Sequence, residues 1–278
     1  MIQIDREYIE FSLRRYVDSL LSLPEIDGVK LCDIVIQNNE HKEANLKEAF
    51  NKSYHDCYSD SDIYVIVNLP KNSKITPLEY IKHPGRFGIT PDKYLGVLKT
   101  GDYGIYRIVF KDGIRYDFGF EFRYDDSFPE IELENEPERE SNPNWPIEKV
   151  DEFWFIMIQA LGKLYRRDYL ISGHLANMNI NDTLVQQMVL RDIKYGTNHH
   201  RYGYSENLIY RKYEGQNKFV TGDDTFDMIA DKLYAAALAY DELTKEFYPD
   251  YGTRSEILFD IWKCYDEHRS NGGLENDN

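Results

Sequence analysis

Cysteine and long apolar runs are scarce in this chain. Only 3 of its 278 residues are cysteine, and Cys32, Cys57 and Cys264 lie far apart. This number and spacing exclude a disulfide framework and a zinc site of closely spaced thiolates. No apolar run approaches the roughly 20 residues of a membrane span, and the N-terminus lacks the basic-then-apolar pattern of a secretory signal. We therefore expect a cytoplasmic protein that makes no contact with a membrane.

Basic residues are also in the minority. The chain has 33 lysines and arginines against 49 aspartates and glutamates, a formal net charge of −16. Such a chain repels a phosphate backbone, which argues against nucleic acid as the main partner. A cationic small molecule fits this charge better, although an acidic surface can also serve solubility alone. The composition leaves monomer and homodimer open.

Two aspartates stand directly before a run of β-branched residues. Asp60-Ser61-Asp62 leads into residues 63–67, Ile-Tyr-Val-Ile-Val, which is typical of a buried strand. Side chains on a strand alternate between faces, so Asp60 and Asp62 project to the same side at its beginning.

A third aspartate has a similar setting. Residues 103–110 and 115–122 are both typical of strands, and Lys111-Asp112-Gly113 between them predicts a tight hairpin. Asp117 then lies in the middle of a strand. Alternation places Asp117, Gly119 and Glu121 on one face. The other face, which is expected to be core, carries Ile114, Tyr116, Phe118, Phe120 and Phe122.

Three carboxylates on one sheet face raise one another's pKa unless a cation neutralises them. Mg²⁺ is the natural candidate, because it prefers oxygen ligands and supports attack on the phosphorus of a nucleoside triphosphate. The structural alternative also stands: Asp60 and Asp62 cap a strand and a turn, and Asp117 pairs with Arg115 or Arg107.

Three segments together resemble the streptomycin (aminoglycoside 6-) adenylyltransferase family of the nucleotidyltransferase superfamily. They are 56–63 (Asp-Cys-Tyr-Ser-Asp-Ser-Asp-Ile), 112–118 (Asp-Gly-Ile-Arg-Tyr-Asp-Phe) and 152–155 (Glu-Phe-Trp-Phe), in the family's order and spacing. The resemblance implies that Asp60, Asp62 and Asp117 bind Mg²⁺. It also implies that ATP is the co-substrate.

The chain departs from the family where a Gly-Ser turn should hold the triphosphate. No glycine occurs between Gly28 and Gly85, although glycine lets backbone N–H groups approach phosphate closely. Ser53 and Ser59 are the candidates to supply a hydroxyl in its place, with Lys52 or Lys42 adding positive charge. If instead the segment fills the triphosphate position, the chain is a catalytically silent relative.

The predicted fold is α/β (α+β). It comprises a nucleotidyltransferase-type mixed β-sheet with flanking helices in residues 1–140, a C-terminal helical bundle in 141–269 and a disordered tail at 270–278. The acidic run at 130–140 is expected to be the linker. The further predictions are helices at 5–21, 44–50, 225–248 and 251–268, one strand at 29–37, a loop-and-helix insertion at 71–101, a helical stripe from Val150 to Leu164 and a helix that Asp182 caps.

The second domain supplies two candidate phosphate-binding cations. The resemblance favours Arg166, and Lys163 lies on the same predicted helix, although the family has Lys-Gly where this chain has Gly162-Lys163. The candidates for the general base are Glu121, on the face of Asp117, and Asp192.

The sequence thus predicts a Mg²⁺-dependent nucleotidyltransferase with its active site between the domains. The resemblance implies that the enzyme transfers AMP from ATP to a hydroxyl of an aminoglycoside-like antibiotic, by in-line attack at the α-phosphate, and so confers resistance. Two alternatives remain: a silent homologue that binds a nucleotide or a protein, and an enzyme with another hydroxylated acceptor.

Overall fold

The chain folds into two units, which divide between Glu138 and Arg139. The computed structural model describes residues 4–100, 105–134, 136, 139–196 and 225–270. The sequence predicted the boundary after residue 140. Apart from Ser270, the predicted disordered tail lies outside the described residues. Within the described ranges, no helix is both long and apolar enough to cross a membrane.

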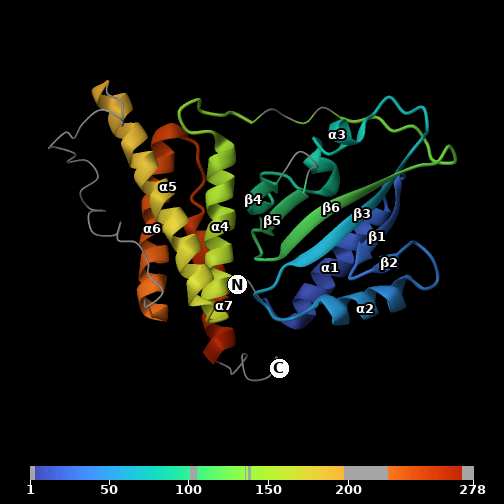
Figure 1. Ribbon diagram of the computed structural model, residues 1–278, viewed down its shortest axis with the longest axis horizontal. Coiled ribbons are helices and arrows are strands. Elements are labelled where there is room, and N and C mark those ends of the chain that lie inside the picture. Colours follow the sequence, from blue (N-terminus) through green and yellow to red (C-terminus); the bar gives the residue numbers. More distant parts are fainter. Residues whose placement is uncertain (1–3, 101–104, 135, 137–138, 197–224, 271–278) are drawn as a thin grey trace. The chain divides into compact units, whose positions relative to one another are not determined.

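The first unit, blue to green in Figure 1, contains a six-stranded sheet in the order β2-β1-β3-β6-β5-β4. β3 and β6 are parallel neighbours at its centre, and the other neighbouring strands are antiparallel. The predicted mixed α/β fold is therefore confirmed. The strands are β1 (Ile26–Leu31), β2 (Ile34–Ile36), β3 (Ser61–Leu69), β4 (Tyr94–Thr100), β5 (Ile105–Phe110) and β6 (Arg115–Tyr124).

The predicted division of β6 into two faces is confirmed. Tyr116 and Phe118 are buried against the ring of Tyr16 in α1 (Arg6–Leu21). Phe120 and Phe122 contact the rings of Phe87 and Tyr80, which belong to the insertion at 71–101. We call this the helix-covered face. The opposite face, which carries Asp62, Tyr64, Asp117, Gly119 and Glu121, is called the carboxylate face.

Two predicted segments differ in the structure. Residues 29–37, predicted as one strand, form the β1–β2 hairpin, because Cys32 and Asp33 have φ angles of 44° and 65° and reverse the chain. Aspartate tolerates this left-handed conformation, but a Cys-Asp pair is a weak turn signal. The end of the 71–101 insertion is edge strand β4, where a glycine at position 96 obscures the alternation.

The insertion itself contains α3 (Pro77–Tyr80) and the 3₁₀-helix η1 (Pro84–Phe87), anchored by a buried carboxylate. Glu25 is fully buried and accepts hydrogen bonds from the Tyr80 hydroxyl at 2.7 Å and from Arg86 at 2.9 Å. Burial alone would raise the pKa of Glu25, but the bonds from Arg86 and Tyr80 outweigh it and lower that pKa. The insertion therefore stays over the helix-covered face.

The second unit is built from helices α4 (Ile147–Tyr165), α5 (Tyr169–Tyr195), α6 (Phe226–Phe247) and α7 (Ser255–Ser270). The predicted stripe from Val150 to Leu164 is buried on α4. One boundary was wrong: Asp182 caps no helix and lies in the middle of the 27-residue α5, whose cap is Asp168. Aspartate is favoured at a helix start, but the residue type alone does not mark a boundary when the helix continues on both sides of it, as α5 does at Asp182.

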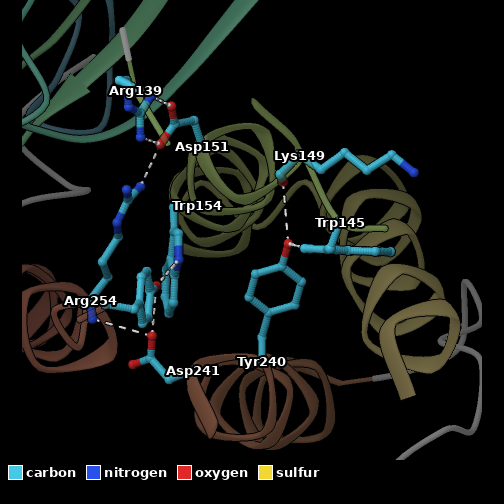
Figure 2. A network of polar contacts seen from close by, with 9 residues as sticks. Arg139, Trp145, Lys149, Asp151, Trp154, Tyr240, Asp241 and Arg254 are labelled. Carbon is cyan, nitrogen blue, oxygen red and sulfur yellow. Dashed lines mark hydrogen bonds and ion pairs between the residues drawn. The ribbon is translucent and has the colours of Figure 1, made fainter. Parts of the chain in front are cut away.

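A buried polar network joins α4, α6 and the start of α7 (Figure 2). Asp151 on α4, 2% exposed, binds Arg139 and also Arg254, the latter at 2.9 Å. Asp241 on α6 accepts the backbone N–H groups of Arg254 and Ser255 at 3.2 and 2.7 Å and so caps the start of α7. The linker residue Arg139 is thereby fixed to the helical unit.

Substitution of Asp151 by alanine tests this network. Asp151→Ala leaves two guanidinium groups without their carboxylate and should lower the free energy of unfolding by about 3 kcal/mol. Urea denaturation measures the change. The control, Asp260→Ala at an exposed position of α7, should stay within about 0.5 kcal/mol of wild type. A loss below about 1 kcal/mol for Asp151→Ala would contradict a structural role for the network.

Candidate active site

The three predicted carboxylates meet at the start of the two central strands. Asp62 on β3 and Asp117 on β6 are register partners across the parallel pair. Side chains of register partners on neighbouring strands point to the same face, so these two lie side by side. Asp60 comes two residues before Asp62, at the entrance to β3, and raises the pKa of both partners through its charge. The sequence therefore brings these residues together as predicted.

Arg107 lies among the carboxylates. Arg107 on β5 is the register partner of Asp117 on its other side, and its Nε donates to Asp117 Oδ2 at 2.7 Å. Its terminal nitrogen lies 3.4 Å from Asp60 Oδ2. The ion pair that the structural alternative predicted between Asp117 and Arg107 is thus present, and the guanidinium links two of the three acids.

Arg115 also contacts the start of the cluster. It is 8% exposed and donates to the backbone carbonyl of Tyr58 at 2.6 Å, while the same nitrogen lies 4.0 Å from Asp60. The buried cation thereby holds the backbone two residues before Asp60 and places positive charge near the Asp60 carboxylate.

The electrostatics of the cluster remain strained despite these arginines. Burial, then the charge of Asp60, raises the pKa of Asp117 to about 6, and Arg107 opposes this shift. The same two causes, in the same order, raise the pKa of Asp62. Burial therefore makes these two carboxylates costly to ionise, and the charge of Asp60 adds to that cost beyond what Arg107 offsets.

One oxygen of the cluster is suited to a cation. Asp117 Oδ1 is buried and accepts no hydrogen bond, which is costly for a carboxylate oxygen. Three aspartates with one such oxygen are a donor set that fits Mg²⁺. The described residues, however, contain no group of three or more histidine, cysteine, aspartate or glutamate side chains arranged to hold a metal ion.

The segment in place of the Gly-Ser turn is largely a helix. α2 (Lys42–Ser53) contains the predicted helical stretch, and its buried residues Leu46, Ala49 and Phe50 make it a packing element. Ser53 ends this helix, with its hydroxyl donating to the Phe50 carbonyl at 3.2 Å.

The two lysines expected to add positive charge have carboxylate partners. Lys52 lies 2.7 Å from Glu48, and Lys42 pairs with Asp18. Their predicted role at the phosphates stays a prediction.

Ser59 lies in a turn that aspartate, rather than glycine, builds. The Asp56 carboxylate accepts the Tyr58 N–H at 2.9 Å and the Ser59 hydroxyl at 3.0 Å. This Asx-type turn spans residues 56–59 and ends directly before Asp60. Of the two predicted serines, Ser59 therefore lies next to a carboxylate of the cluster.

Glu121 lies on the carboxylate face, four residues after Asp117, with an ion pair to Arg123 at 2.7 Å. The other predicted residues belong to the second unit. Lys163, in the last turn of α4, lies 4.0 Å from Asp168, and Arg166 is the C-terminal cap of that helix. Asp192 on α5 pairs with Arg191 at 3.0 Å. The roles predicted for Glu121, Lys163, Arg166 and Asp192 stay predictions.

The second unit has a polar hollow that the sequence did not predict. Its volume is about 260 Å³, and Lys149, Glu152, Met178, Asn181 and Asp182 line it. Burial, then the charge of Glu152, raises the pKa of Asp182 to about 6. Met178 and Asp182 lie one turn apart on α5 and therefore share a helix face. The sequence did not suggest this, because Asp182 was predicted to begin a new helix.

A comparison with protein-family models finds no match for this chain, and a comparison with curated proteins finds none either. The functional argument accordingly rests on the geometry of the carboxylate cluster and on the motif spacing.

The pKa of Asp117 gives a stability test without metal. Because the folded-state pKa rises from 3.8 to about 6, the stability that Asp117 contributes is present below about pH 4 and is lost as pH rises through about 6. Asp117→Asn removes the ionisable carboxyl group and therefore this loss of folding stability. Between about pH 4 and pH 8 the variant should therefore gain about 2 kcal/mol relative to wild type, within the limit of about 3 kcal/mol that such a shift allows.

Urea denaturation across this pH range measures the gain. Asp33→Asn, at a side chain that is 95% exposed, is the control and should follow wild type. Parallel stability curves for wild type and Asp117→Asn would show that Asp117 carries no such strain.

Proposed function

We propose that this protein is a nucleotidyltransferase that moves AMP from ATP to a hydroxyl group of a cationic, aminoglycoside-like acceptor. One observation carries the proposal: Asp62 and Asp117 are register partners on parallel strands, Asp60 stands two residues earlier, and Asp117 Oδ1 is buried without a hydrogen bond. The motif resemblance supports the same reaction.

Asp60, Asp62 and Asp117 would hold Mg²⁺ in this reaction. The ion supplies positive charge for the phosphate oxygens in the transition state. The chain's part is to fix the three carboxylates before substrate arrives: the β3–β6 register aligns Asp62 with Asp117, and the Asp56 turn with Arg115 sets Asp60. Such preorganisation lowers the cost of assembling the charges.

Arg107 would have to release Asp60 and Asp117 when metal binds, because its positive charge bridges the same two carboxylates that would hold the cation. The guanidinium of Arg107 would then donate to two oxygens of a phosphate group in a bidentate manner. Ser59, next to Asp60, is the nearest predicted hydroxyl for the same purpose. Arg107 would thus change partners between the free and the substrate-bound protein.

The choice of a cationic acceptor follows from charge. The chain has a net charge of −16, and the carboxylates of Asp60, Asp62 and Asp117 lie together at the candidate site. Glu121 on the same face is about half exposed and is proposed to accept the proton of the attacking hydroxyl.

The silent-homologue alternative is also supported by a specific observation. Arg107 already bridges Asp60 and Asp117, as a permanent structural cation would. In that case the carboxylates stabilise the sheet and hold no metal, and the protein binds a nucleotide or a protein partner without turnover.

A radiolabel experiment separates these functions. The protein is incubated with Mg²⁺, a panel of aminoglycosides and lincosamides, and ATP labelled at either the α- or the γ-phosphate. Label should reach an acceptor from α-labelled ATP and leave as pyrophosphate from γ-labelled ATP. Asp60→Asn, Asp62→Asn and Asp117→Asn should each lower transfer by about a hundredfold or more, as expected when several kcal/mol of charge stabilisation is lost.

Asp33→Asn is the matched control and should retain wild-type transfer, because its exposed side chain lies in the β1–β2 turn. Transfer of the γ-label to the acceptor would replace the proposal with phosphoryl transfer. Absence of any transfer, together with metal-independent ATP binding, would favour the silent homologue.

A further inference from the structure

Tyr64 is an exposed aromatic residue one step from the carboxylate cluster. It follows Asp62 by two residues on β3, so its side chain lies on the carboxylate face, roughly 7 Å farther along the strand. The side chain is 49% exposed, although most of β3 beyond it is buried. An aromatic ring left half in water beside three aspartates requires an explanation.

Gly119 determines how this ring lies. Gly119 is the register partner of Tyr64 on β6, two residues after Asp117. A Cβ at this glycine would be 2.6 Å from both Cδ1 and Cε1 of the Tyr64 ring, so the ring lies directly over the glycine backbone. Any other residue at position 119 would displace it.

Packing of a ring on a glycine across two strands by itself stabilises a sheet. That role uses one side of the ring and leaves the other to solvent. The surroundings of the ring are charged: Asp62 and Asp117 precede it, and Glu121 follows on β6 with its side chain 46% exposed. Lys30, the register partner on β1, is directed to Asp33 at 3.3 Å.

We infer that the Tyr64 ring, held over Gly119, is the platform on which a cationic group of the acceptor binds. An ammonium or guanidinium group is attracted to the face of a tyrosine ring, and nearby carboxylates strengthen the attraction. The inference rests on the proposed function for the identity of the acceptor and adds the residue that selects a cation. The platform would hold a hydroxyl of the same molecule close to the aspartates.

Calorimetry with streptomycin as the probe tests the platform. Tyr64→Leu should raise the Kd for streptomycin about tenfold, equivalent to about 1.4 kcal/mol, and Tyr64→Phe, which keeps the ring, should stay within about twofold of wild type. Gly119→Ala should act like Tyr64→Leu, because the new methyl group displaces the ring. The double variant should bind no more weakly than Tyr64→Leu, since no ring remains to be displaced.

The controls separate binding from folding and from the nucleotide. Tyr124→Leu changes another exposed tyrosine, 52% exposed at the end of β6, and should leave the Kd unchanged. Melting temperatures establish that each variant is folded. The Kd for MgATP should change less than twofold in Tyr64→Leu, and the neutral polyol myo-inositol should bind wild type and Tyr64→Leu equally weakly.

Three results would overturn the inference. They are an unchanged streptomycin Kd in Tyr64→Leu, the absence of streptomycin binding by wild type, and an equal loss of MgATP affinity, which would make the ring a nucleobase platform. A different outcome decides the proposed reaction. Streptomycin binding that follows these variants without AMP transfer would keep the platform and remove the reaction, whereas transfer with unchanged binding would do the reverse.

Discussion

The parallel pairing of β3 and β6 is the constraint on which the candidate site depends. Its register aligns Asp62 with Asp117 and, two residues farther along both strands, Tyr64 with Gly119. Because side chains alternate in a strand, a shift of β6 by one residue relative to β3 would move Asp117 and Gly119 to the helix-covered face and separate them from their partners. The apolar partners on the opposite face hold this register in place: Ile63, Val65 and Phe118 are buried, and Phe120 packs on the ring of Phe87.

The register concentrates negative charge that the protein only partly neutralises. Arg107 and Arg115 reach Asp60, and Arg107 also reaches Asp117, but the pKa values of Asp62 and Asp117 remain raised. A sheet under selection for stability alone would pair these acids fully or replace them. Residual strain at a cluster of this kind is a physical reason to assign it a function.

The parts of the fold that sequence patterns predicted are those with strong periodicity. Alternation predicted both faces of β6, and helical spacing predicted α4 and α6. The Asp-x-Asp motif and the hairpin at Gly113 predicted that Asp117 would lie near Asp60 and Asp62, and the charge interactions among the three confirm that proximity.

Local patterns were insufficient where the outcome depended on backbone conformation or on distant contacts. The β1–β2 hairpin turns at Cys32-Asp33, a pair with little turn preference, and Asp182 continues a helix that its residue type favours only at the start. The ring of Tyr64 over Gly119 could not be predicted without the register of two strands 55 residues apart, as the pairing of Tyr64 with Gly119 shows. The pair of Arg107 with Asp117 was among the alternatives drawn from the sequence, whereas the second contact of Arg107, with Asp60, was not.

The central claim is that these carboxylates exchange Arg107 for a divalent cation. A crystal structure with Mn²⁺ and a non-hydrolysable ATP analogue tests it most directly, because manganese scatters anomalously and takes oxygen ligands. The account predicts an anomalous peak about 2.1 Å from oxygens of Asp60, Asp62 and Asp117, with Arg107 moved away from Asp117. A map without such a peak, in which Arg107 Nε still lies 2.7 Å from Asp117 Oδ2, would contradict it.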